Sequence, residues 1–199
     1  MLGNGRKVKT APMNIRENIR PGGRSARVQA SVHKAVRDLL STMDRGDVTI
    51  PLIAAEAGVT PSTIYRRWGD LQELLADVAV EHLRPDAPPK DTGSARTDLE
   101  LWAEQYADEM ASGPGRAMIR DVLSSTGTET RNAGKCCGYT REQLQAIAAR
   151  ADDRGEAFPD VETVIDHVVA PIMFRILFDE TPAAAGQVRL LVEKVLPER

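Results

Sequence analysis

Residues 49–75 constrain the fold most, because the ends of two short helices can be located there. Thr49 can cap the first helix, and Gly58 can end it by taking the left-handed conformation that turns the chain. Thr60 can cap a second helix that has Pro61 at its first position, where the missing N–H costs no hydrogen bond. This spacing predicts a helix-turn-helix.

The helices that flank this motif are predicted from their apolar periodicity. Apolar residues recur at helical spacing over positions 25–43. They recur again after Asp70, which can form a capping box with Glu73, and this helix is expected to end near Leu83. The alternation that is typical of strands is absent, and we therefore expect an all-α fold.

The second helix of the motif presents polar side chains opposite its buried face. When Val59 and Ile64 face the core, the outward face carries hydroxyl and guanidinium groups, on Ser62, Thr63, Tyr65 and Arg66. Such groups can contact base edges and phosphates in a major groove, whereas the alternative is a solvated helix surface. We favour DNA contact, because the arginines directly follow a capped helix of the recognition type.

The pattern A-x-x-A-G-V-T-x-S-T-I-Y-R-R-W over residues 54–68 resembles the TetR family of bacterial transcriptional regulators. The resemblance covers residues 24–84 and implies a three-helix DNA-binding domain, a helical ligand-binding and dimerisation domain, and a homodimeric repressor controlled by a small molecule. It implies a near-palindromic double-stranded operator. The expected DNA contacts are Arg27, Thr49, Thr60, Pro61, Ser62, Thr63, Tyr65, Arg66 and Arg67.

Charge is distributed unevenly along the chain, although the net charge is only −3. Residues 1–84 carry a net charge of +4 and residues 85–199 carry −7. The first 30 residues hold seven basic side chains and one acidic one, and residues 1–23 are therefore predicted to form a basic arm. The family usually has a phosphate-binding lysine where this chain has Leu71, and the arm is the candidate to replace it. The alternative is a solvated tail.

A proline-rich break at residues 85–93 is predicted to separate the DNA-binding domain, 24–84, from a second helical domain, 94–199. Helical stripes are expected at about 99–110, 118–123, 141–153, 160–178 and 183–196, with a looser stretch over 124–138. Pro171 is expected to kink the fourth of these helices. The phrases A-x-x-R-G-E at 151–156 and P-I-M-F-R at 171–175 also resemble a TetR subfamily.

The last two helices are predicted to form the dimer interface. Their apolar stripe is broader than a small monomer covers, and the family pairs the corresponding helices. The residues assigned to this interface are Val161, Ile165, Val168, Ile172, Ile176, Val188, Leu191 and Val195. The alternative is a core within one subunit.

A ligand cavity is expected between the helices of the second domain, mainly by analogy with the family. Aromatic and sulfur-containing side chains shape apolar pockets, but they serve ordinary cores equally well. The candidates are Trp102, Tyr106, Met110, Met118, Cys136, Tyr139 and Phe174.

Catalytic motifs are missing from the sequence, which shows no phosphate-binding glycine loop, nucleophile elbow or spaced His/Cys cluster. No catalytic residue, cofactor or metal is therefore expected. The alternative function is a thiol-dependent enzyme or redox sensor that uses the adjacent Cys136 and Cys137.

Adjacent cysteines cannot staple a secreted fold, and no apolar run approaches the roughly 18 residues of a membrane span. We expect a cytoplasmic protein without membrane contact.

Overall fold

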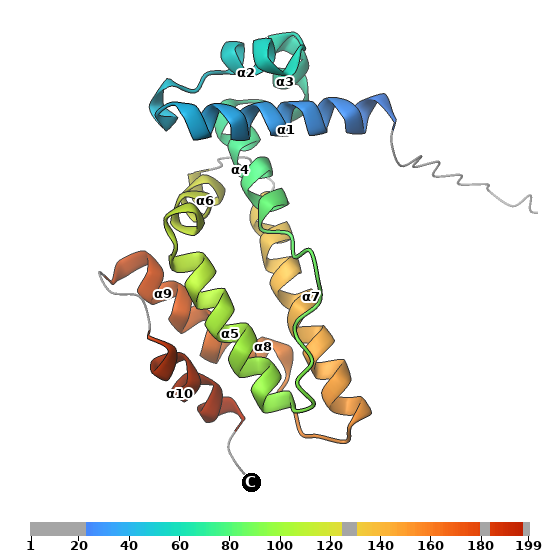
Figure 1. Cartoon of the computed structure of the whole chain (residues 1–199), viewed down its shortest axis with the longest axis vertical. Helices are drawn as coiled ribbons and strands as arrows, with labels where there is room; N and C mark the ends of the chain where they lie inside the picture. Colours follow the sequence, from blue (N-terminus) through green and yellow to red (C-terminus); the bar gives the residue numbers. More distant parts are fainter. Residues whose placement is uncertain (1–22, 125–130, 180–183, 197–199) are drawn as a thin grey trace, which may run out of the picture.

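The computed structural model describes residues 23–124, 131–179 and 184–196, in which helices are joined by loops and no strand occurs (Figure 1). The predicted all-α fold is confirmed. The predicted basic arm lies outside the described residues, apart from Gly23. The helices of the first part are α1 Arg24–Thr42, η1 Arg45–Asp47, α2 Ile50–Ala57, α3 Pro61–Trp68 and α4 Leu71–His82. Those of the second part are α5 Ala95–Ala111, α6 Gly113–Ser124, α7 Arg131–Asp153, α8 Val161–Val164, η2 Ile165–Val169, α9 Ala170–Phe178 and α10 Ala185–Val195.

Local sequence signals set the ends of the first helices. Gly58 ends α2 with a φ of 67°, a conformation that other residues rarely adopt. Asp70 caps α4, because its Oδ1 accepts a hydrogen bond of 2.8 Å from the Glu73 N–H. Thr49 and Thr60 occupy the predicted cap positions with extended backbones, but neither side chain accepts a hydrogen bond from its helix.

One hydrophobic core joins α1 to α4. It includes Val36 of α1, Ile53 of α2, Ile64 of α3 and Leu74 of α4, all of which are fully buried. In Figure 1, α1 runs across this unit, with α2 and α3 on one side and α4 leaving on the other. The recognition-type helix α3 therefore rests on a packed base of three other helices.

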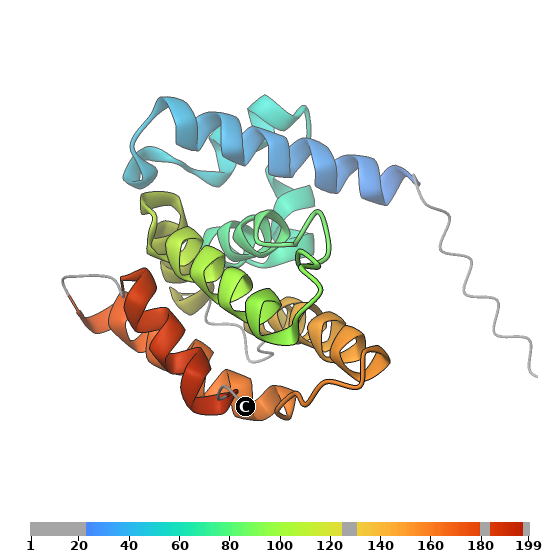
Figure 2. The ribbon, with the colours of Figure 1, turned by 60° about the horizontal axis from the view of Figure 1, so that its bottom comes forward.

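A second core lies among α5 to α10. Figure 2 shows α5 between α7 on one side and α9 and α10 on the other, an arrangement that agrees with the contacts of these helices. Helix α4 belongs to both parts of the molecule, because it packs against α1 and α3 and also against α6 and α7. Gly115 allows the close approach of α6 to the end of α5, since a Cβ there would collide with the Glu109 carbonyl oxygen.

The structure differs from the sequence prediction in two stretches. The stretch expected to be loose is helical from Arg131 onward, and the contacts of α7 with α4 and α5 outweigh the low helix propensity of Gly134 and Gly138. The helix expected over 160–178 is divided by the π-helical segment η2, in which the Ala170 N–H donates to the Ile165 carbonyl. The shift in hydrogen-bond spacing directly precedes Pro171, which has no N–H to donate.

Candidate DNA-binding surface and effector cavity

Helix α3 exposes a polar face of residues from the predicted DNA-binding set. Ile64 anchors the helix in the core, whereas Ser62, Tyr65 and Arg66 are exposed, Tyr65 to 52%. At the start of α3, the Thr60 hydroxyl lies 2.9 Å from that of Ser62 and 3.0 Å from that of Thr63, which is half-buried. The N-terminal turn thus carries three hydroxyl groups at the positive end of the helix dipole, a combination suited to phosphate oxygens.

The arginines of the predicted set have different surroundings. Arg67 donates from Nη2 to the Ser25 hydroxyl at 2.9 Å, which ties the end of α3 to the start of α1. Arg66 forms no ion pair with any residue in the described ranges, and its charge is exposed. Arg27, Thr49 and Pro61 are also exposed. The exposed members of the set come from α1, from the start of α2 and from α3.

A buried carboxylate under α3 was missed by the sequence reasoning. Asp77 lies in the middle of α4, within a run of buried residues from Leu74 to Val80. Its Oδ2 accepts from Trp68 Nε1 at 2.9 Å and from His33 Nε2 at 3.0 Å, and its Oδ1 accepts from Lys135 Nζ at 2.9 Å. Burial opposes ionisation, but these donors outweigh it and hold the pKa of Asp77 well below its usual range. A single acid inside an apolar helical run was the signal that could have pointed to this site.

Two further contacts connect the DNA-binding part to α6 and α7. Arg45 of η1 forms an ion pair with Asp121 of α6, whose pKa is raised by burial in spite of this arginine. Asn132 of α7 donates to Glu73 of α4 at 3.5 Å. Both contacts join residues more than 50 positions apart in the chain.

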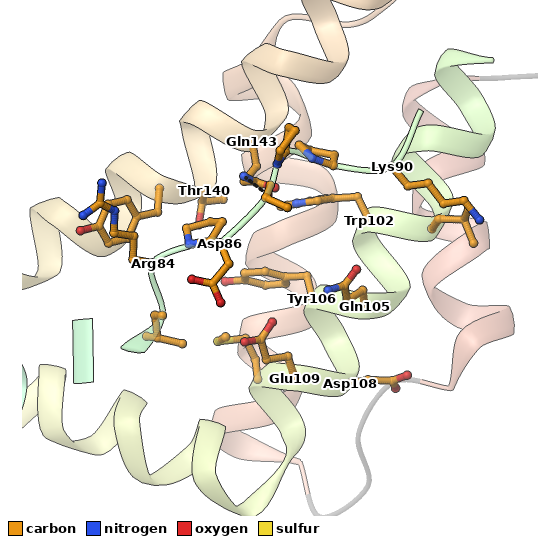
Figure 3. A pocket seen from close by; sticks show the side chains of 18 of the residues that line it. Arg84, Asp86, Lys90, Trp102, Gln105, Tyr106, Asp108, Glu109, Thr140 and Gln143 are labelled. Atoms are coloured by element: carbon orange, nitrogen blue, oxygen red, sulfur yellow. Dashed lines mark hydrogen bonds between the residues drawn. The ribbon is translucent and has the colours of Figure 1, made fainter. Parts of the chain in front are cut away.

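A cavity of about 1040 Å³ lies between α5, α7 and the connecting segment at residues 83–94 (Figure 3). Five of the predicted ligand-binding residues line it: Trp102, Tyr106, Met110, Cys136 and Tyr139. The Trp102 and Tyr106 rings are stacked, with centroids 5.3 Å apart. The sequence reasoning missed the contribution of the connecting segment, including Arg84, Asp86 and Pro88, and the polar side chains of Thr140 and Gln143.

The other two predicted ligand-binding residues are not among the residues that line this cavity. Met118 lies half-buried on α6, outside the lining residues. Phe174 lies on α9, 60% exposed, with its ring 5.1 Å from that of Phe178. Helix α9 packs against α5 on the side away from α7, which explains why Phe174 cannot reach the cavity.

The cavity combines an apolar floor with charged groups at its edge. Burial, followed by the neighbouring Cys136 thiol, raises the pKa of Tyr106, so its hydroxyl stays neutral and can donate a hydrogen bond. Asp86 and Glu109 are exposed at the edge and form no ion pair with any residue in the described ranges. Burial also raises the pKa of the Cys136 thiol, which disfavours the thiolate that a thiol-dependent enzyme would need.

The predicted dimer residues lie in the core of a single subunit. Val168, Ile172, Ile176 and Val188 are fully buried there, and their side chains are already covered by the subunit itself. Val161, Ile165, Leu191 and Val195 are half-buried against the same core. The apolar side chains that α9 and α10 do expose are Phe174, Leu177, Phe178 and Leu190.

The phrase A-x-x-R-G-E has a structural role. Arg154 donates to Glu156 and to Asp98, and the Glu156 carboxylate accepts from the Ala95 N–H at the start of α5 at 2.6 Å. The Asp98 side chain is fully buried and also accepts from Thr92. This network fixes the end of α7 to the connecting segment and to α5.

The described parts of the chain contain neither a metal-binding cluster nor a membrane-spanning helix. No group of three or more His, Cys, Asp or Glu side chains there could hold a metal ion. None of the helices there is long and apolar enough to cross a membrane.

Comparison with known proteins connects this geometry to a family. The family model "Bacterial regulatory proteins, tetR family" matches residues 34–78, and "Tetracyclin repressor-like, C-terminal domain" matches residues 89–195. The HTH-type transcriptional regulator AqdR of Rhodococcus erythropolis is 31% identical over 67% of this chain and 65% of its own. The uncharacterized HTH-type transcriptional regulator Rv1556 of Mycobacterium tuberculosis is 26% identical over 75% of this chain and 76% of its own.

Solved structures show the same fold. The TetR family transcription regulator SCO0332 has a TM-score of 0.65 at 24% identity, over 85% of this chain and 96% of its own. A TetR transcriptional regulator from Rhodococcus sp. RHA1 has a TM-score of 0.60 at 16% identity, over 88% and 98%. The chain therefore belongs to the TetR family of helix-turn-helix transcriptional regulators.

Proposed function

We propose that this regulator is a homodimeric repressor that binds a near-palindromic operator and is released from it by a small molecule. The observation that carries this proposal is the exposed polar face of α3, which is backed by a core of three other helices. A rigid helix with an exposed polar face fits the recognition helix of a helix-turn-helix, whose N-terminal residues contact base edges.

Within this proposal, the predicted DNA-binding residues divide into two groups. We expect Ser62, Thr63 and Tyr65, in the first turns of α3, to meet base edges or nearby phosphates. Arg66 is the strongest candidate for a phosphate contact, because its charge has no ion-pair partner in the described ranges. The remaining members, Arg27, Thr49, Thr60, Pro61 and Arg67, flank this face, and Arg67 can exchange its Ser25 contact for a phosphate.

We assign the two functions to two parts of the chain, residues 24–84 for DNA binding and residues 94–199 for ligand binding and dimerisation. The cavity supports the second assignment, because its volume and stacked rings suit a drug-sized, largely apolar molecule with a few polar groups. The exposed apolar side chains of α9 and α10 support a dimer, since a second copy can cover them symmetrically. These four residues replace the buried ones that the sequence suggested.

The DNA-binding proposal is tested by selecting bound sequences from random duplex DNA and measuring affinity at several salt concentrations. A dimer should select half-sites about 34–36 Å apart or somewhat farther. R66A should weaken binding to every sequence and lower the salt slope by about one unit. The matched control is R120A, which removes an exposed arginine from α6 and should leave the slope unchanged.

Two outcomes contradict the proposal. Selection of asymmetric single sites argues against a dimer that reads the groove twice. An unchanged salt slope in R66A would show that Arg66 does not contact a phosphate.

A further inference from the structure

Asp77 is an unusual residue for its position, because every neighbour from Leu74 to Val80 along α4 is buried and apolar. A carboxylate placed there must be stabilised by donors, since an unpaired buried charge is strongly unfavourable. The donors come from α1, from the end of α3 and from α7. One side chain thus contacts both sides of the junction between the DNA-binding part, residues 24–84, and the effector part, residues 94–199.

The two oxygens of Asp77 serve the two sides separately. Oδ2 accepts from the DNA-binding part: from the Trp68 indole, from His33 and, at 3.5 Å, from Gln29. Because an ionised carboxylate only accepts, the His33 Nε2 must carry the hydrogen. Oδ1 accepts from the effector part, where Lys135 is the donor. A change in the Lys135 contact therefore alters the charge and orientation of the group that holds Trp68.

Lys135 is also next to the cavity. Cys136, the following residue of α7, lines it, as do Tyr139 and Thr140 one turn farther on. At the other end, Trp68 is the last residue of α3 and directly follows Arg67, which is tied to α1. A shift of the first turns of α7 by a molecule in the cavity consequently displaces Lys135, and the only side chain between Lys135 and Trp68 in this series of contacts is Asp77.

We propose that Asp77 is a positioning residue for the recognition helix, and that its ion pair with Lys135 makes the placement of α3 depend on α7. The inference rests on the proposed DNA-binding function and adds the contact through which the effector part acts on it. With the ion pair formed, Asp77 holds the indole of Trp68 and α3 is in its DNA-binding position. Without it, the carboxylate lacks its cation, and the end of α3 is held less firmly.

The test removes the cation while the aliphatic part of the side chain is kept. K135M breaks the ion pair, and this variant should fold because the Lys135 side chain is 42% exposed. The matched control is R141M, which removes a cation of equal exposure from the same helix. Arg141 forms its ion pair with Glu162 of α8, whereas Lys135 pairs with Asp77 of α4.

Operator affinity is the first measurement, with a duplex obtained by selection with the wild-type protein. K135M should bind about tenfold more weakly, which corresponds to about 1.4 kcal/mol, whereas R141M should bind like the wild type. W68F removes the indole donor and keeps an aromatic ring, and its effect should not add to that of K135M. A double-mutant cycle therefore gives a coupling energy between two side chains that share Asp77 as their partner.

The second measurement does not require DNA. The protein has two tryptophans, so its NMR spectrum contains two indole N–H signals, and W102F assigns them. The Trp68 signal should shift and exchange faster with solvent in K135M but not in R141M. If K135M leaves this signal and operator affinity unchanged, or if K135M and W68F are additive, the inference is wrong. Failure of the wild-type protein to select any duplex instead contradicts the proposed function, and the indole signal still decides the role of Asp77.

Discussion

The exposed face of α9 and α10 provides the sharpest test of the dimer, through the substitution F178A. The Phe178 side chain is 72% exposed in the subunit, and its ring centroid lies 5.1 Å from that of Phe174. A phenylalanine buries about 150–250 Å² when it is fully covered. At about 25 cal/mol per Å², covering the exposed part in a dimer stabilises it by about 3 kcal/mol per side chain at the lower end of this range of areas.

Each dimer contains this side chain twice. If a symmetric interface covers only half of the exposed area, F178A still weakens the dimer by about 3 kcal/mol, which raises its Kd about 100-fold. The stability of the subunit itself should change little, because most of the ring is in water. Sedimentation velocity over a range of protein concentrations measures the Kd, and thermal unfolding of the monomer measures the stability.

The matched control is L123A, which removes an apolar side chain of α6 that is 65% exposed and lies outside the α9 and α10 face. It should leave the Kd unchanged. Equal Kd values for F178A, L123A and the wild type would refute this placement of the interface, and so would a wild-type protein that stays monomeric at every concentration.

Three other substitutions or deletions test separate parts of the structure. I172A should destabilise the subunit by about 2–5 kcal/mol without a specific effect on the dimer Kd, because Ile172 is fully buried. A denaturant titration measures this loss of stability. Weaker dimerisation of I172A at unchanged subunit stability would show that Ile172 belongs to the interface. Deletion of residues 1–22 should lower DNA affinity and make its salt dependence shallower, and equal values for both would show that these residues do not contact DNA. Although burial opposes ionisation of Asp98, hydrogen bonds from Thr92 and the charge of Arg150 lower its pKa. A depressed pKa stabilises the fold above the unfolded value of about 4, and this contribution is lost as the pH falls through the folded value. D98N should therefore be less stable than the wild type at pH 7 and should lose less stability on acidification, as measured by thermal unfolding at pH 7 and below pH 4.

The alternative function, thiol chemistry at Cys136 and Cys137, receives no support from their surroundings. Cys136 lines the cavity with a pKa raised by burial, and no basic side chain that could activate it is paired with it in the described ranges. Cys137 is exposed on α7.

The sequence by itself determined the helix-turn-helix, because its signals are local. Gly58 turns the chain at a positive φ and Asp70 caps α4 through its own side chain, and neither feature depends on distant residues. The outward face of α3 followed in the same way, since the burial of Ile64 fixes which side chains point away. The cavity residues of α5 and α7 were predicted in part, because aromatic and sulfur-containing side chains at helical spacing mark an inner surface.

Only the tertiary structure decided which partners meet across long stretches of chain. Asp77 and Lys135 are 58 positions apart, and periodicity cannot bring one to the other. Nor could periodicity show that the stripe at Ile172 faces α5 while Phe178 remains exposed, because a helix with apolar residues on two faces can bury either one. The choice between these faces is made by the helices that pack against α9, and it decides where a second subunit can bind.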